Sequence, residues 1–178
     1  MDSLRFFKSY NNKFNCFKNQ NIIVTGATGG IGKVLVQTLI DLEANVIVIS
    51  RSEKKVFDVF KALVNEKSFY YEIINFEDPN TINKGFSKIM KKFNGKLNSL
   101  ILCHGLFKVG KMKETLIDQF DSTLNVNVRS CYHLISISSS FLKLTKGNIV
   151  VLSSVESKIP SNDTFLNSLS KVIILILF

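Results

Sequence analysis

The sequence contains only three cysteines, Cys16, Cys103 and Cys131, and it contains no tryptophan. An odd number of widely spaced cysteines excludes the disulfide framework of a small secreted domain and the paired cysteines of a zinc site. We therefore predict no metal site and a reducing compartment in which thiols stay free, the cytoplasm.

Long apolar runs are also lacking. The longest, residues 172–178, is far too short to cross a bilayer, so the sequence predicts no transmembrane segment. Residues 1–20 contain four basic residues against a single acid, Asp2, and lack the apolar core of a secretory signal. We interpret residues 1–20 as an N-terminal extension. A mitochondrial presequence is the alternative, which Asp2 and the cluster of asparagines argue against.

Acidic residues are few compared with basic ones. The chain has 14 Asp and Glu and 23 Lys and Arg, which give a formal net charge of +9. Such a balance is typical of proteins that bind nucleic acid or an anionic membrane surface. Here, however, lysines such as Lys84, Lys88, Lys91 and Lys92 fall on the polar side of an expected helix. We interpret them as a solvated helix face, predict no nucleic-acid partner, and expect the positive charge to attract a polyphosphate cofactor.

Short apolar runs alternate along the chain with segments of helical periodicity. The runs predict strands over residues 21–25, 45–50, 69–74, 99–103 and 149–152. The periodic segments predict helices over residues 31–42 and 53–65, from residues 77–79 to about 93, and over 115–120 and 122–144. This alternation predicts an α/β fold, a doubly wound parallel sheet of Rossmann type, with residues 21–178 as one dinucleotide-binding domain.

The first two predicted helices each have an apolar face that we expect to pack on the sheet. The first face consists of Ile31, Val34, Leu35, Leu39 and Leu42. The second consists of Val56, Val59, Phe60 and Leu63.

Glycines are concentrated between the first predicted strand and the first predicted helix, where residues 25–32 read TGATGGIG. Glycine permits a tight turn and removes the Cβ that would keep a pyrophosphate away from the backbone. The helix that follows offers free N–H groups and the positive end of its dipole. The position of the cluster in a βαβ unit therefore predicts a phosphate-binding loop rather than a simple connection.

These residues match the TGxxxGxG pattern of the short-chain dehydrogenases/reductases, and three later motifs extend the match. Residues 120–127 fit FDxxxxVN, residues 147–154 fit GxIVxxSS, and Ser170-Lys171 fits the end of YxxxK. The chain therefore resembles this family from about Asn21 to Lys171.

The resemblance implies a site for NAD or NADP and assigns residues to it. An acidic residue after the second strand signals NAD in this family, but this chain has Ser50-Arg51, and Arg51 can pair with the 2′-phosphate of NADP. We therefore favour NADP(H) over NAD(H). At the family's Asp-apolar pair this chain has Asn75-Phe76, and of the NNAG motif only the glycine remains, in Leu102-Cys103-His104-Gly105. We interpret His104 as a variant loop residue rather than a base or metal ligand. The expected cofactor-binding residues are Gly26, Thr28, Gly29, Gly30, Ile31, Gly32, Ser50, Arg51, Asn75, Phe76, Gly105, Asn127 and Lys171.

The resemblance also implies a catalytic set of Asn, Ser, Tyr and Lys. Asn127, Ser154 and Lys171 stand at three of these positions, but Asn167 stands where the family has the tyrosine. An amide does not ionise in this pH range, and the loss of a positioned proton donor costs about 10²–10⁴ in rate. The expected activity is the NAD(P)-dependent interconversion of an alcohol and a carbonyl compound. The alternative is a catalytically impaired nucleotide-binding protein.

The chain is also shorter than the family pattern. Family members continue past the YxxxK helix through further strands and a segment that covers the substrate, whereas this sequence stops within that helix. We expect the C-terminal strands of the fold to be missing, which leaves a truncated gene product as a further alternative. In the family this helix contributes to a subunit interface, so the resemblance implies a homo-oligomer, and the sequence leaves both oligomeric state and substrate open.

Overall fold

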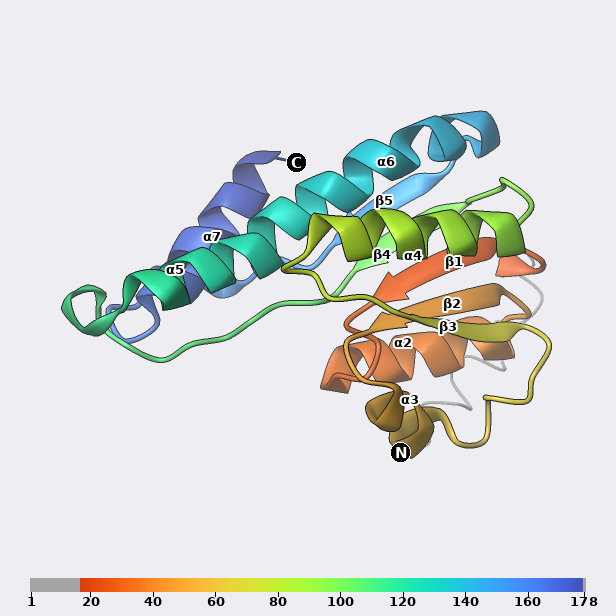
Figure 1. The fold of residues 1–178 in the computed structure, drawn as a ribbon, viewed down its shortest axis with the longest axis horizontal. Helices are drawn as coiled ribbons and strands as arrows, with labels where there is room; N and C mark the ends of the chain where they lie inside the picture. Colours follow the sequence, from red (N-terminus) through yellow and green to blue (C-terminus); the bar gives the residue numbers. More distant parts are fainter. Residues whose placement is uncertain (1–16, 178) are drawn as a thin grey trace.

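The computed structural model describes residues 17–177 and contains one sheet of five parallel strands (Figure 1). The strands follow the spatial order β3-β2-β1-β4-β5. Their bounds are Asn21–Thr25 for β1, Asn45–Ser50 for β2, Phe69–Ile73 for β3, Ser99–Leu102 for β4 and Asn148–Val151 for β5. The predicted doubly wound sheet is thus confirmed. The chain reverses its direction of winding between β1 and β4, the place where such sheets bind ligands.

Helices cover both faces of this sheet. Helices α2 (Gly30–Asp41) and α3 (Glu53–Phe60) lie on one face, and α4 (Pro79–Lys92) and α6 (Ser130–Thr145) lie on the other (Figure 1). The remaining elements are η2 (Met112–Glu114), α5 (Ile117–Leu124), a π-helical turn η3 (Asn125–Arg129), η4 (Val155–Ser157) and α7 (Phe165–Leu177).

Each face of the sheet has its own apolar core. Ile22 and Val24 of β1 pack with Val36 of α2, whereas Ile23 between them packs with Phe86 of α4 on the opposite face. Successive strand residues point to opposite faces, so a strand covered on both sides needs a continuous apolar run. This is why the central strands are apolar without alternation.

The helix boundaries differ from the sequence prediction in two places. Helix α3 ends at Phe60 instead of residue 65, although Leu63 in the following turn is still buried. The two helices expected over 115–120 and 122–144 form one helical stretch through α5, η3 and α6. The other elements begin and end within one or two residues of the prediction, which is the usual scatter of such boundaries.

The predicted apolar face of the first helix was partly wrong. Leu39 is buried, but Ile31 and Val34 are exposed, and the side of α2 that meets the sheet also contains Gly32 and Val36. Gly32 allows β1 and α2 to approach closely, which rotates Ile31 and Val34 outward. In α3, Val56 and Phe60 are buried as expected, whereas Val59 is 38% exposed.

Strand β5 lies at one edge of the sheet and pairs with β4 alone within residues 17–177. Its side chains Ile149 and Val150 are exposed, as are Leu175, Ile176 and Leu177 at the end of α7. The described part of the chain thus leaves an apolar edge.

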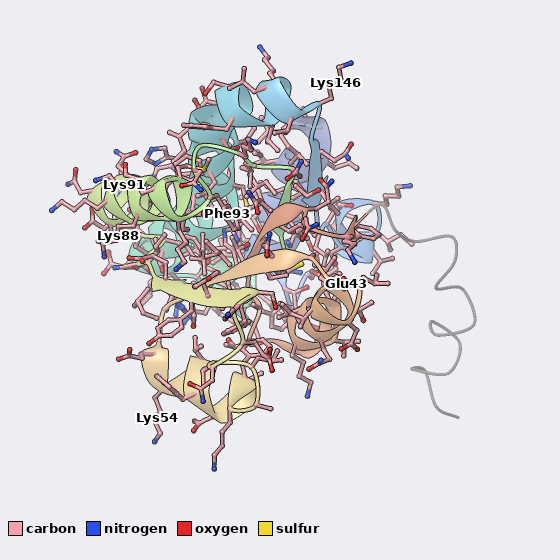
Figure 2. The ribbon with its side chains drawn as sticks, turned by 90° about the vertical axis from the view of Figure 1, so that its right-hand side faces the viewer. Glu43, Lys54, Lys88, Lys91, Phe93 and Lys146 are labelled. Carbon is pink, nitrogen blue, oxygen red and sulfur yellow. The ribbon has the colours of Figure 1, made fainter. Side chains whose placement is uncertain are left out.

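The lysines of α4 are exposed, as the interpretation of a solvated face predicted, although Lys88 pairs with Glu72 at 2.8 Å and Lys92 lies 3.8 Å above the Tyr70 ring. Figure 2 shows Lys88 and Lys91 on the outside of this helix, while Phe93 at its end points inward. No helix in residues 17–177 is both long and apolar enough to span a membrane.

Candidate active site

The glycine loop connects β1 to α2 with very little space around it. Gly26 has a φ of +62°, and a Cβ at this position would lie 2.6 Å from the backbone of Cys103 and His104. A Cβ on Gly32 would lie 2.7 Å from the Cα of Ala27 and closer still to the carbonyl oxygen of Gly26. Glycine at both positions therefore lets the loop pass between β4 and the first turn of α2.

A cavity of about 290 Å³ opens beside this loop, at the carboxyl ends of β1, β2 and β4. Its lining residues are Gly26, Thr28, Gly29, Ile49, Ser50, Arg51, Lys55, Phe76, Cys103, His104, Gly105 and Val126. Among these described lining residues, two are cations and none is acidic. The cavity therefore has the electrostatic character that an anionic ligand requires.

Arg51 and Lys55 both line the cavity because of the turn that joins β2 to α3. Ser52 caps α3, and its hydroxyl accepts a hydrogen bond from the backbone N–H of Lys55 at 3.4 Å. Ser50 stabilises the same turn, since its hydroxyl accepts from the N–H of Ser52 at 3.2 Å. The turn thus places both cations near the end of β2.

Of the expected pair Asn75-Phe76, only Phe76 lines the cavity. The exposed side chain of Asn75 accepts a hydrogen bond from the N–H of Glu77 at 3.1 Å and so stabilises the start of the following turn. Gly30, Ile31 and Gly32 also lie outside the cavity lining. Gly30 and Ile31 begin α2, where a Cβ on Gly30 would meet no protein atom within 4 Å.

His104 is a buried residue of the cavity wall and is held on three sides. Its ring stacks on Phe76 with centroids 4.0 Å apart, its Nδ1 lies 2.5 Å from the Thr25 hydroxyl, and its Nε2 lies 2.7 Å from the Ser130 hydroxyl. Burial, with the nearby charge of Lys171, lowers the pKa of His104 from 6.5 to about 3. Within residues 17–177 no group of three His, Cys, Asp or Glu side chains is arranged to hold a metal ion. His104 is thus a neutral core residue that lines the cavity.

Asn127 is buried in the π-helical turn and fixes the loop after β4. Its Oδ1 accepts from the N–H of Leu106 at 2.6 Å, and its Nδ2 donates to the carbonyl of Leu106 at 3.0 Å and to the Ser170 hydroxyl at 2.9 Å. One side chain therefore ties the β4 loop to α7. A π-helical turn of this kind often marks a functional position.

Lys171 reaches toward the same loop from α7. Its ammonium group donates to the carbonyl of Leu152 at 2.8 Å, at the end of β5. A Cβ built on Gly105 would lie 3.6 Å from the Asn127 Oδ1 and 3.7 Å from the Lys171 Nζ. Both groups thus lie next to Gly105, which lines the cavity, although neither Asn127 nor Lys171 is itself a lining residue. Burial lowers the pKa of Lys171.

Asn167 lies one turn before Lys171 on the same face of α7 and is buried. Its Nδ2 donates to Oε2 of Glu156 at 2.6 Å, and the Ser168 hydroxyl donates to the same oxygen at 3.2 Å. The Asn167 hydrogen bond lowers the pKa of Glu156 by stabilising its charged form. Ser154 completes this group of residues, since its hydroxyl accepts from the N–H of Glu156 at 3.2 Å.

Comparison with known proteins identifies the family to which this chain belongs. A family model described as "short chain dehydrogenase" matches residues 20–176. The chain belongs to the short-chain dehydrogenase family. It is 24% identical over 152 residues to an uncharacterised oxidoreductase of Staphylococcus saprophyticus, a match that covers 84% of this chain and 64% of the relative. It is 27% identical over 151 residues to a tropinone reductase homologue of Arabidopsis thaliana, covering 79% of this chain and 54% of the relative.

Solved structures show the same fold. An apo SCOR enzyme from Clostridium thermocellum superposes with a TM-score of 0.82 at 24% identity, covering 89% of this chain and 64% of that chain. A ligand-free aldohexose dehydrogenase of Thermoplasma acidophilum superposes with a TM-score of 0.80 at 21% identity, covering 92% and 60%. The chain thus spans about three fifths of the length of these proteins.

The residues present fit the NAD(P) cofactor of the short-chain dehydrogenase family. The loop after β1 is packed closely against protein at Gly26 and Gly32, while Thr28 and Gly29 line the cavity. The N-terminus of α2 offers backbone N–H groups to phosphate, and Arg51 and Lys55 add positive charge to the cavity.

Two residues of this region were missed by the sequence analysis. Lys55 lies in the first turn of the helix that begins directly after Arg51, and this closeness to the end of β2 was a signal that it shares the cavity. Glu156 follows Ser154 by two residues, but no pattern in the sequence indicated that its carboxylate meets Asn167, because that contact depends on the fold of the loop before α7.

Proposed function

We propose that this short-chain dehydrogenase binds NADP(H) in preference to NAD(H) and interconverts an alcohol and a carbonyl compound by hydride transfer. The observation that carries the cofactor preference is the pair Arg51 and Lys55 in a cavity whose described lining has no carboxylate. A carboxylate at this place would accept the ribose 2′-hydroxyl of NAD, whereas a guanidinium and an ammonium favour a 2′-phosphate.

When bound, the cofactor supplies or accepts the hydride. The chain's own groups orient the reactants beside it. In this proposal Lys171 donates to the nicotinamide ribose, Asn127 holds the loop at Gly105, and the Ser154 hydroxyl positions the substrate oxygen. The low pKa of Glu156 keeps its carboxylate ionised, so it orients Asn167 and does not donate a proton.

We further propose a small-molecule alcohol or carbonyl compound as substrate, no nucleic-acid partner, and self-association of the chain. The location proposed is the cytoplasm, since Cys103 and Cys131 are both free thiols in the described chain.

Titration with NADPH and NADH, followed by calorimetry, tests the cofactor preference. NADPH should bind more tightly than NADH. Arg51→Ala and Lys55→Ala should each weaken NADPH binding about tenfold, since each removes one charge-assisted contact with phosphate, while NADH binding changes little. Lys54→Ala is the matched control, because Lys54 lies on the same helix and points into solvent (Figure 2). Equal binding of the two cofactors, or equal losses in the control, would refute the preference.

Asn167 favours a second candidate function, a nucleotide-binding protein with impaired catalysis. Its amide is engaged by Glu156 and supplies no ionisable proton at the position where the family has tyrosine. Under this candidate NADPH binds normally and turnover is about 10²–10⁴-fold below that of a chain with the proton donor.

Asn167→Tyr tests this candidate in a screen of alcohols with NADP and carbonyl compounds with NADPH. We expect the variant to gain turnover while its NADPH affinity stays that of the wild type. The control is Asn167→Phe, which adds the ring without the hydroxyl and should gain nothing. Turnover by the wild-type chain at a rate that Asn167→Tyr does not raise would exclude impairment at this residue.

A further inference from the structure

A second polar cavity, of about 230 Å³, lies at the amino ends of β1, β2 and β3, whereas the cofactor cavity lies at the carboxyl ends of the strands. We call it the amino-end cavity. It is lined by Asn21, Asn45, Lys67, Tyr70, Lys92, Phe93 and Asn94 and shares no lining residue with the cofactor cavity. Its volume is below the range of about 300–1,000 Å³ that is typical of sites for drug-sized ligands, so its occupant is a small group.

Asparagine side chains fix the backbone around this cavity. Nδ2 of Asn21 donates to the carbonyl of Lys96 at 2.9 Å and to the carbonyl of Phe93 at 3.4 Å. Oδ1 of Asn21 accepts from Nδ2 of Asn45 at 3.1 Å. These bonds join the first residues of β1 and β2 to the segment after α4. The walls of the cavity are thus fixed to one another before a ligand binds, which lowers the entropic cost of binding.

The carbonyl groups at the end of α4 are already engaged. The carbonyl of Lys91 accepts from the N–H of Asn94 at 3.2 Å, and that of Met90 accepts from the N–H of Gly95 at 2.9 Å. Asn94 and Gly95 have φ angles of +50° and +72°, the left-handed conformation that commonly ends a helix. Lys91 and Lys92 in the last turn offset the negative end of the helix dipole. The end of α4 therefore does not exclude an anion from the cavity.

Two cations reach the cavity from different elements. Lys92 belongs to the last turn of α4, and its Nζ lies 3.8 Å from the centroid of the Tyr70 ring on β3. This contact restricts the positions of the ammonium group. Lys67 belongs to the segment before β3, and neither lysine makes an ion pair with any residue of the described chain. Both positive charges are therefore available to a ligand.

None of the described lining residues is acidic. Glu66 is next to Lys67 in the sequence, but it does not line the cavity. Glu72 shares a face of β3 with Tyr70, because residues two apart in a strand point to the same side. Its carboxylate, however, pairs with Lys88 at 2.8 Å. The cavity thus has positive charge without a carboxylate from residues 17–177 to neutralise it.

We propose that the amino-end cavity binds a phosphate group, either free phosphate or the end of a small phosphate monoester. A phosphate monoester carries a charge of about −1.5 to −2 at pH 7 and three strong acceptor oxygens. Two ammonium groups balance this charge, and the Tyr70 hydroxyl and the Asn94 amide add neutral donors to the lining. A carboxylate has a single charge and leaves one cation uncompensated. This site is independent of the dinucleotide site and does not rest on the proposed activity.

Titration of the ¹⁵N-labelled full chain with inorganic phosphate tests this proposal, because amide shifts separate the two cavities. Asn94 and its neighbour Gly95 report on the amino-end cavity, whereas Thr28 and Gly29 report on the cofactor cavity, which also contains cations. Phosphate should shift the Asn94 and Gly95 signals to saturation, and acetate or chloride at the same ionic strength should not. Glycerol 3-phosphate distinguishes the two sources: tighter binding than inorganic phosphate identifies a monoester as the ligand, and weaker binding identifies free phosphate.

Substitution of the lysines tests which groups hold the phosphate. Lys67→Ala and Lys92→Ala should each weaken the phosphate affinity measured at Asn94 about two- to fivefold, the effect of removing one exposed charge. Lys91→Ala is the matched control, because Lys91 lies in the same turn of α4 and outside the cavity lining (Figure 2), and it should change nothing. All three side chains are exposed, so the melting temperature of each variant should stay close to that of the wild type.

Arg51→Ala should weaken the phosphate response of the cofactor cavity and leave that of Asn94 unchanged. Saturating NADPH should likewise leave the affinity at Asn94 unchanged, so that failure of cofactor binding and failure of this site are separate results. Three outcomes would overturn the proposal: a response to acetate equal to that to phosphate, equal losses in Lys91→Ala and Lys92→Ala, or phosphate shifts confined to the cofactor cavity.

Discussion

At the scale of the residue, His104 shows how a polar side chain becomes a core residue. The Ser130 hydroxyl donates its one proton to the carbonyl of Val126 at 2.6 Å, so it can only accept from the Nε2 of His104. The ring therefore carries its proton on Nε2, and its Nδ1 accepts from Thr25. The neutral ring satisfies one donor and one acceptor at once, which is the condition for burying it.

This arrangement predicts how the stability of the chain depends on pH. Because the pKa of His104 is lowered to about 3 in the folded state, protonation below pH ~6.5 favours the unfolded chain. The contribution of the neutral His104 ring to the free energy of unfolding is complete above pH ~6.5, and it is lost as the pH falls from there toward 3. The free energy of unfolding should fall by about 2 kcal/mol between pH 7 and pH 5 from this residue alone.

Urea unfolding at each pH, for the wild type and His104→Gln, measures this contribution. Glutamine keeps one donor and one acceptor but does not titrate, so its slope between pH 7 and pH 5 should be flatter. The tautomer is read from the ¹⁵N shifts of the imidazole. Parallel pH slopes for the two proteins, or a His104 that titrates near pH 6.5, would contradict a neutral buried ring.

At the scale of the element, the junction of β1 with α2 serves two purposes: it packs the helix on the sheet, and it forms one wall of the cavity. Gly26 needs its left-handed backbone, and Gly32 needs the absence of a Cβ, before α2 can lie against the strand and direct its N-terminus at the cavity. The face of α2 that contains Gly32 packs against the strand, and Ile31 and Val34 on the other face are therefore exposed.

Gly32→Ala and Gly30→Ala form a matched pair that tests this junction. The alanine methyl at Gly32 would lie 2.7 Å from the Cα of Ala27, which should destabilise the chain by about 1–3 kcal/mol, the usual cost of overpacking. At Gly30 the methyl meets no protein atom within 4 Å, so stability should stay the same or rise by about 0.5–1 kcal/mol from helix propensity. Thermal unfolding monitored by circular dichroism compares them, and equal melting temperatures would show that the close contact is relaxed without cost.

At the scale of the whole molecule, helices cover both faces of the sheet, and β5 is one of its two edge strands in residues 17–177. Val150 of β5 is 47% exposed and pairs with Ile101 of the neighbouring strand β4. An exposed edge strand with apolar side chains is a template for pairing with another chain. The net charge of +9 opposes such association at low salt.

We therefore expect the chain to self-associate increasingly as salt screens its charge, and Val150→Lys to reduce this association. The substituted side chain is already exposed, so the melting temperature should change little. Sedimentation velocity at two salt concentrations measures the effect, with Lys146→Ala on the protruding end of α6 as a control (Figure 2). Association that is insensitive to both salt and Val150→Lys would place the contact elsewhere.

The sequence by itself determined the order of strands and helices and the position of the glycine loop. These are local properties: an apolar run long enough for a strand, a helical period, and glycines at fixed spacing. The family motifs placed Asn127, Ser154, Asn167 and Lys171, and the fold brings Asn127 and Lys171 next to Gly105, which lines the cavity. Their catalytic roles remain predictions.

Only the tertiary structure decided which of these side chains meet and which side of each helix is buried. Asn167 contacts Glu156, His104 stacks on Phe76, and Asn75 turns away from the cavity to cap a backbone N–H. The physical reason is that such contacts join residues far apart in the chain or separated by a loop. Their geometry depends on how closely elements pack, as at Gly32, and no periodicity or spacing in the sequence encodes that distance.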